Sequence, residues 1–109
     1  MRRIYPEEDW CSSWKATYRY DLEEVYGEHQ DLGYAYSYAQ RRDFTLRALT
    51  GVLPPGSRIL DIAAAQGNFS LTLAEMGYEV TWNDLRADMI DYVKMKHEKG
   101  SVAYVGGNA

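Results

Sequence analysis

Apolar residues in the first half of the chain recur at helical spacing. One helix is predicted to begin at an N-cap of Ser12 or Ser13 and to end at Gly27, where a left-handed residue is easily placed. A second helix is predicted over residues 34–53, because its apolar positions lie three or four residues apart. Pro54–Pro55–Gly56 follows and stops it.

The second half alternates short apolar runs with helical patterns. The run from Arg58 to Ile62 is continuously apolar after a turn, which is typical of a buried parallel strand. Asn68 can cap the helix that follows, and Gly77 can end it. The remaining elements are expected as a strand over 78–83, a helix over 86–97 and a strand over 101–105.

Strands that alternate with helices predict an α/β fold with a parallel sheet and right-handed crossovers. We therefore divide the chain into an N-terminal helical lid or cap segment, residues 1–53, and a sheet-bearing segment, residues 54–109. Only three strands precede the last residue, Ala109, so the sheet is expected to be incomplete in this chain. Either the domain is truncated, or a partner covers its open edge.

Composition and charge narrow the class of protein. Hydrophobic residues make up 46% of the chain and charged residues 26%, which is typical of a globular protein. The net charge of −4 makes a nucleic-acid partner unlikely in electrostatic terms. Cys11 is the single cysteine, and no apolar run in the sequence is long enough to span a bilayer. We expect a cytoplasmic protein without a membrane partner.

The segment from Asp61 to Gly67 carries the clearest chemistry. A parallel strand leaves the sheet here and must turn into a helix while leaving room for a ligand against its backbone. Ala63, Ala65 and Gly67 are small enough to permit that approach. Asp84 follows Gly67 by 17 residues, at the end of the next strand, where a carboxylate can accept hydrogen bonds from a ribose diol.

These residues carry a family resemblance. The sequence ILDIAAAQGNF resembles the first motif of class I S-adenosylmethionine-dependent methyltransferases, in which an acid precedes a Gly-x-Gly-x-Gly loop. VTWNDL resembles their second motif, and VGGNA resembles the segment after their third strand. The resemblance covers about half of the chain, from Leu53 onward. It implies a Rossmann-like three-layer α/β sandwich, S-adenosyl-L-methionine as cofactor, and methyl transfer to an acceptor that we expect to be a small molecule.

The resemblance assigns one end of the cofactor to the first loop. Asp61 and the loop that contains Ala63, Ala65 and Gly67 would face its methionine portion, and Asp84 would bind its ribose hydroxyls. Ala63 and Ala65 stand where the family has its first two glycines, which narrows the approach to the backbone by a methyl group each.

The adenine end is assigned to four further residues. Leu85 and Met89 would flank the ring, and Asn108 and Ala109 would meet its edge. Asn108 replaces the usual acid of the family, so it keeps an acceptor oxygen, adds a donor and removes the charge.

A tyrosine-rich segment precedes the sheet, at the place where the resembling enzymes often keep a helical lid. Tyr34, Tyr38 and Arg41 are candidates for binding the cofactor carboxylate or the acceptor through a hydroxyl or a guanidinium group. Ordinary helix packing is the preferred explanation of the same residues, and the binding role stays open beside it.

Two other functions are alternatives to methyl transfer. An NAD-dependent oxidoreductase would need a third small residue at position 68, within the helix, and this chain has Asn68 there. A non-catalytic half-Rossmann interaction domain that forms a homodimer through its open sheet edge and the Tyr-rich helices remains the other alternative. Asp84, Asp88 and Asp91 are better explained by a solvated helix start than by a metal site, and no residue is assigned as catalytic.

Overall fold

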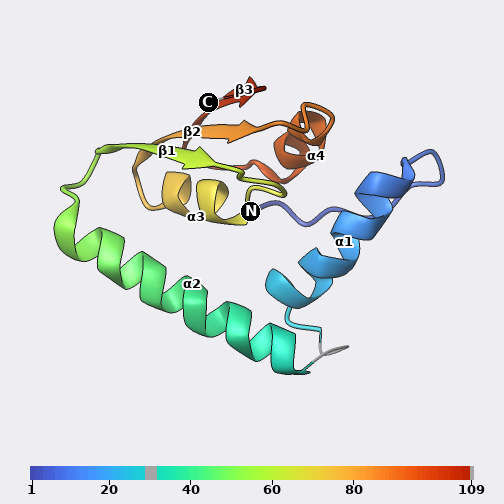
Figure 1. The fold of residues 1–109 in the computed structure, drawn as a ribbon, viewed down its shortest axis with the longest axis horizontal. Coiled ribbons are helices and arrows are strands. Elements are labelled where there is room, and N and C mark those ends of the chain that lie inside the picture. The colour runs from blue at the N-terminus through green and yellow to red at the C-terminus, as the bar shows by residue number, and fades with distance from the viewer. Residues whose placement is uncertain (29–31, 109) are drawn as a thin grey trace. The chain divides into compact units, whose positions relative to one another are not determined.

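The computed structural model describes residues 1–28 and 32–108, whose ribbon is drawn in Figure 1, and the chain divides into two compact units. Residues 1–5 and 54–109 make up the sheet unit, and residues 6–53 make up the helical unit. The first five residues had been grouped with the helices in the sequence, but they pack with the sheet. Here the Arg2 backbone N–H donates to the Lys96 carbonyl at 2.8 Å.

The helical unit holds α1, Ser12–Glu24, and α2, Leu32–Val52. The prediction that Ser12 or Ser13 caps α1 is wrong. Cys11, with extended backbone angles, is the N-cap and makes no side-chain cap hydrogen bond. The helix begins one residue early because the Lys15 N–H already donates to the Cys11 carbonyl, at 3.1 Å.

The sheet unit alternates strands and helices in the predicted order. Its elements are β1 (Arg58–Ile62), α3 (Asn68–Glu75), β2 (Glu79–Asp84), α4 (Met89–Lys96) and β3 (Ser101–Gly106). The three strands are parallel and lie in the order β1-β2-β3, so β2 is central. Together with the similarities reported below, this arrangement confirms the predicted α/β fold and its incomplete parallel sheet.

Strand register separates the two faces of the sheet. Asp61, Trp82 and Tyr104 are register partners on one face, where Trp82 is completely buried. α3 packs against β2 and β3, and Figure 1 shows it beneath the strands. Residues one step along each strand point to the opposite face. There Leu60 and Ile62 remain 55% and 58% exposed, so the third layer of the predicted sandwich is missing from the described sheet unit.

Two helix starts in the sheet unit differ from prediction. Asn68 does not cap α3: Gly67 is the N-cap, with a left-handed φ of 74°, and Asn68 is the first helical residue. Its side chain instead accepts a hydrogen bond from the buried Lys96 Nζ at 2.8 Å. α4 begins at Met89 and not at Arg86, because the Arg86 N–H is bonded to the Asp84 carboxylate at 2.9 Å.

Within 1–28 and 32–108, none of the helices combines the length and the apolar character needed to cross a bilayer.

Candidate functional site

A cavity of about 450 Å³ lies where the three strands of the sheet unit end. This volume is within the range of small-molecule binding sites. The carboxyl ends of β1 and β2 contribute to it, as do the segments that follow β1, β2 and β3. Its walls are formed by Ile62, Ala63, Asn83, Asp84, Leu85, Arg86, Gly107 and Asn108. It therefore occupies the edge at which open α/β sheets bind their ligands.

The loop after β1 has an unusual backbone. Ala63 and Ala65 have φ values of 57° and 48°, in the left-handed region that L-residues with a Cβ rarely adopt. These are the two positions at which the resembling family has glycines. The loop therefore keeps the glycine-type conformation with alanine side chains, at a cost of about 1–2 kcal/mol for each residue.

Hydrogen bonds from β2 hold the loop in this conformation. The Ala65 N–H donates to Asp84 Oδ2 at 2.9 Å, and the Trp82 indole N–H donates to the Ala65 carbonyl at 3.1 Å. The Ala64 N–H donates to the Asn83 carbonyl at 3.0 Å. Three consecutive residues of β2 thus fasten two consecutive residues of the loop, which offsets the backbone strain.

Relief of this strain is a testable consequence. Replacing Ala65 by glycine is expected to raise the free energy of unfolding by about 1 kcal/mol, because glycine adopts positive φ without a steric penalty. Urea denaturation of the chain measures the change. Ala64 is the control, since its φ is not positive. Ala64→Gly is expected to lower stability by roughly 0.5–1 kcal/mol. Equal losses in both variants would contradict the strain argument.

Asp84 connects the loop, the cavity and β2. It is 7% exposed at the end of the strand, and its Oδ1 accepts a hydrogen bond from the Arg86 N–H at 2.9 Å. Burial raises the pKa of Asp84, but the backbone hydrogen bonds from Arg86 and Ala65 outweigh it, so the pKa is lowered from 3.8. The carboxylate is therefore charged at neutral pH. Two backbone donors leave it with further acceptor capacity for a ligand.

Asp61 is placed differently. Its Oδ2 accepts a hydrogen bond from the Ser70 hydroxyl of α3 at 2.6 Å, and it does not line the cavity. Burial is the main cause that raises the pKa of Asp61, and the negative charge of Asp84 adds to it, while the Ser70 hydrogen bond opposes both. Asp61 ties β1 to the start of α3, and its predicted contact with the methionine portion stays a prediction.

Only some of the other predicted residues line the cavity. Leu85 lines the cavity and is 71% exposed, and Asn108 also lines it. Gly67, at the end of the loop, is buried and does not line the cavity, and Met89 is fully buried in the core. The geometry gives no support to a contact between Met89 and adenine, so that contact stays a prediction. Ala109 lies outside the described residues.

Sequence reasoning missed three residues that line the cavity, namely Ile62, Asn83 and Arg86. Asn83 shapes the site, because its side-chain amide donates to the carbonyls of Val105 and Gly107 at 3.0 and 3.1 Å. It holds the segment after β3 beside the end of β2. The signal in the sequence for Asn83 was its position directly before Asp84, the acid of the second motif.

Tyr34, Tyr38 and Arg41 lie on α2, in the helical unit. Tyr38 is 6% exposed, and the Arg41 guanidinium lies 5.8 Å from the centre of its ring. Their predicted role in binding the cofactor carboxylate or the acceptor stays a prediction.

One curated protein is similar to this chain in sequence over a short stretch. No protein-family model matches the chain. Over 44 residues it is 46% identical to a Bacillus subtilis (strain 168) protein named "Putative methyltransferase YqeM", a stretch that covers 40% of this chain and 18% of that protein. The chain therefore spans less than a fifth of this curated relative.

Solved structures extend the similarity to the fold. A TehB-like SAM-dependent methyltransferase from Corynebacterium glutamicum matches with a TM-score of 0.50 and 27% identity, over 72% of this chain and 47% of that one. Magnesium protoporphyrin IX methyltransferase (ChlM) from Synechocystis PCC 6803, solved with bound SAH, matches with a TM-score of 0.69 and 18% identity. That match covers 86% of this chain and 47% of ChlM, so its identity supports the fold alone.

These similarities confirm the resemblance seen in the sequence. The chain has the fold of class I S-adenosylmethionine-dependent methyltransferases, and it spans about half the length of the two solved structures that it matches.

Proposed function

We propose that this chain is the cofactor-binding half of an S-adenosyl-L-methionine-dependent methyltransferase whose acceptor is a small molecule. One observation carries the proposal. Asp84 lies at the end of β2 with its charged carboxylate in the wall of the cavity, beside the strained loop that it holds by a hydrogen bond. A ribose diol needs such an acceptor next to closely approachable backbone.

The cofactor would supply a methyl group made electrophilic by its sulfonium centre. The described residues would bind and orient it: Asp84 at the ribose, Leu85 against adenine, and Asn108 at the adenine edge. Methyl transfer depends mainly on positioning the acceptor near the methyl group. No described residue is assigned to act on the acceptor.

The alternatives receive less support. Asn68 begins α3 and is buried, with its side chain bonded to Lys96, where a dinucleotide-binding helix would need a small residue. A homodimer formed through the sheet has its basis in the exposed Leu60 and Ile62. The homodimer and the cytoplasmic location both stay predictions.

Titration with S-adenosylhomocysteine, the product form of the cofactor, tests the proposal. Isothermal titration calorimetry of the 109-residue chain is expected to show one site of micromolar affinity, about −8 kcal/mol. NAD⁺ at the same concentrations serves as the comparison ligand and is expected to give no heat of binding. Absence of binding by S-adenosylhomocysteine, or equal binding by NAD⁺, would overturn the proposal.

A further inference from the structure

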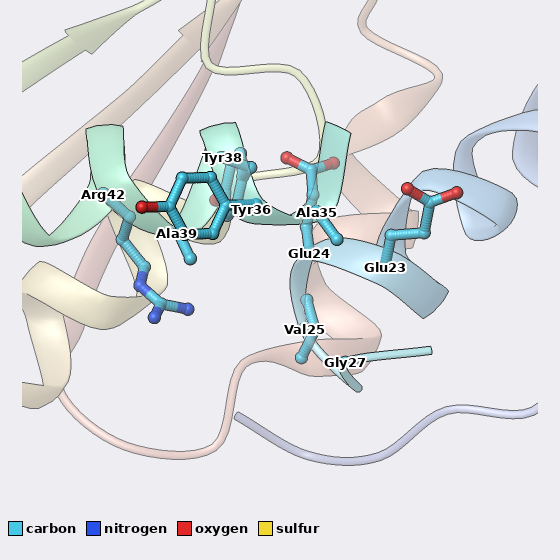
Figure 2. Close-up of a pocket in the computed structure, with 9 residues that line it drawn as sticks. All are labelled: Glu23, Glu24, Val25, Gly27, Ala35, Tyr36, Tyr38, Ala39 and Arg42. Carbon is cyan, nitrogen blue, oxygen red and sulfur yellow. The ribbon is translucent and has the colours of Figure 1, made fainter. Parts of the chain in front are cut away.

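The helical unit contains a second cavity, of about 470 Å³, between residues of α1 and α2 (Figure 2). Its size again lies in the range of small-molecule sites. Glu23 and Glu24 line it from α1, whereas Tyr36, Tyr38 and Arg42 line it from α2. Figure 2 shows the two carboxylates toward one end of this lining and the Arg42 guanidinium toward the other. The cavity therefore combines aromatic surface with fixed charge.

The carboxylate of Glu23 is incompletely satisfied. Its Oε2 atom is shielded from solvent, and none of the described residues donates a hydrogen bond to it. A buried carboxylate oxygen without a donor carries a desolvation cost that nothing offsets. A positive charge placed in the cavity that this side chain lines would offset that cost.

The neighbouring charges do not supply the missing cation. Glu24 adds a second negative charge, and it accepts a hydrogen bond from the Tyr34 hydroxyl. Arg42 is the single basic residue in the lining, and its Nε lies 3.2 Å from Asp43 Oδ1 in an ion pair. The lining thus keeps an excess of negative charge.

The wider charge distribution has the same sign. Residues 6–53 contain nine acidic and five basic side chains, a net charge of −4, whereas the rest of the chain contains seven of each and is neutral. Burial is the main cause that raises the pKa of Tyr38, and the Glu24 charge adds to it. The Glu24 charge that contributes to this shift would favour a bound cation.

Aromatic rings complete the lining. Tyr36 is 68% exposed, so its ring is available to a ligand, while Tyr38, which also lines the cavity, is almost fully buried. The Arg41 guanidinium over Tyr38 shows that a ring of this cluster already accepts a cation on one face. Tyrosine faces attract ammonium groups through the ring quadrupole.

We propose that this cavity binds an organic ammonium ion, a small molecule whose positive charge lies beside Glu23 and whose apolar part lies against Tyr36 and Tyr38. The site lies within the helical unit alone. It does not depend on the proposed cofactor, so loss of S-adenosylhomocysteine binding would leave the inference standing.

Three probes of nearly equal shape isolate the charge. They are 2-phenylethylamine, which is an ammonium ion at pH 7, 2-phenylacetamide, which is neutral, and phenylacetate, which is an anion. Chemical shifts of the backbone amides of the chain, followed by NMR during titration, report binding and its location. The amine is expected to bind with a dissociation constant on the order of 1 mM and to shift amides of the helical unit, including those of Ala35 and Ala39.

Matched variants isolate the residues. Glu23→Gln keeps the shape of the side chain and is expected to weaken binding of the amine about tenfold, since hydrogen bonds to charged groups are the stronger kind. Glu28→Gln is the control, because Glu28 is exposed, does not line the cavity and loses the same charge. Its effect is expected to stay below about twofold, the level of a screened surface charge.

A second pair of variants tests the aromatic contact. Tyr36→Leu is expected to weaken binding of the amine about threefold, whereas Tyr36→Phe, which keeps the ring face, is expected to leave it unchanged. Tyr36 is exposed, so neither change is expected to unfold the chain.

Three results would overturn the inference. The first is absence of amide shifts with 2-phenylethylamine up to about 50 mM, because the affinity would then be too weak for a binding site. The second is equal affinity for the neutral amide or the anion. The third is an equal loss of affinity in Glu23→Gln and Glu28→Gln.

Discussion

Replacing Asp84 by asparagine is expected to weaken S-adenosylhomocysteine binding by roughly a hundredfold, equivalent to about 2.7 kcal/mol. The change removes the charge that would strengthen both hydrogen bonds to the ribose. It also removes one acceptor oxygen from a side chain whose two oxygens each accept a backbone N–H, from Ala65 and from Arg86. One backbone donor then faces an amide NH₂ group, so the loop is loosened at the same time. Isothermal titration calorimetry measures the loss.

The control for Asp84→Asn is Asp91→Asn. Asp91 is exposed on α4, does not line the cavity, and loses the same charge when changed. Its variant is expected to bind S-adenosylhomocysteine within about twofold of the parent, as a screened surface charge should. Circular dichroism of both variants separates loss of binding from loss of fold. A folded Asp84→Asn variant with parental affinity would remove the carboxylate from the proposed site.

The order of elements in the sheet unit could be predicted because its signals are local. Arg58–Ile62 is a short apolar run after a proline–glycine turn, and its predicted bounds agree with β1. Glycine marks the end of α3 well, since its C-cap Met76 directly precedes Gly77. Patterns of this kind depend on the residue and its immediate neighbours, which the sequence displays directly.

Helix starts were less predictable because distant partners compete for the capping side chains. Asn68 has the composition of an N-cap, but its side chain is bonded to Lys96, which lies 28 residues away on α4. Lys96 itself is fully buried. Neither fact is visible without the packing of α4 against α3. Tertiary contacts therefore override local capping preference at this position.

The sequence could predict where the candidate site lies, but only some of the features that shape it. Parallel strands bring their carboxyl ends to one edge, which was enough to place Ala63 and Asp84 together. The sequence could not show that Ala63 and Ala65 adopt positive φ, because alanine ordinarily avoids it. That conformation is imposed by hydrogen bonds from β2, whose donors and acceptors become neighbours only when the sheet forms.

Gly67→Ala is expected to lower the free energy of unfolding by about 3 kcal/mol, through steric overlap and an unfavourable backbone angle together. A Cβ at this position would lie 2.6 Å from Val93 Cγ1 and 3.4 Å from Trp82 Cδ1. Val93 is completely buried, so it cannot move aside cheaply, whereas the approach to Trp82 is an ordinary contact. The residue also has a φ of 74°. Urea denaturation followed by circular dichroism measures the change.

Gly56→Ala separates the two causes. Gly56 has a similar φ of 81°, but a Cβ there would meet nothing within 4 Å. Its variant is expected to lose only the backbone contribution, about 1–2 kcal/mol. The difference between the two losses of unfolding free energy then measures the steric overlap with α4. A difference near zero would contradict that overlap. If that packing fixes the loop, Gly67→Ala should also weaken S-adenosylhomocysteine binding, whereas Gly56→Ala should not, because Gly56 precedes β1 and lies outside the cavity wall.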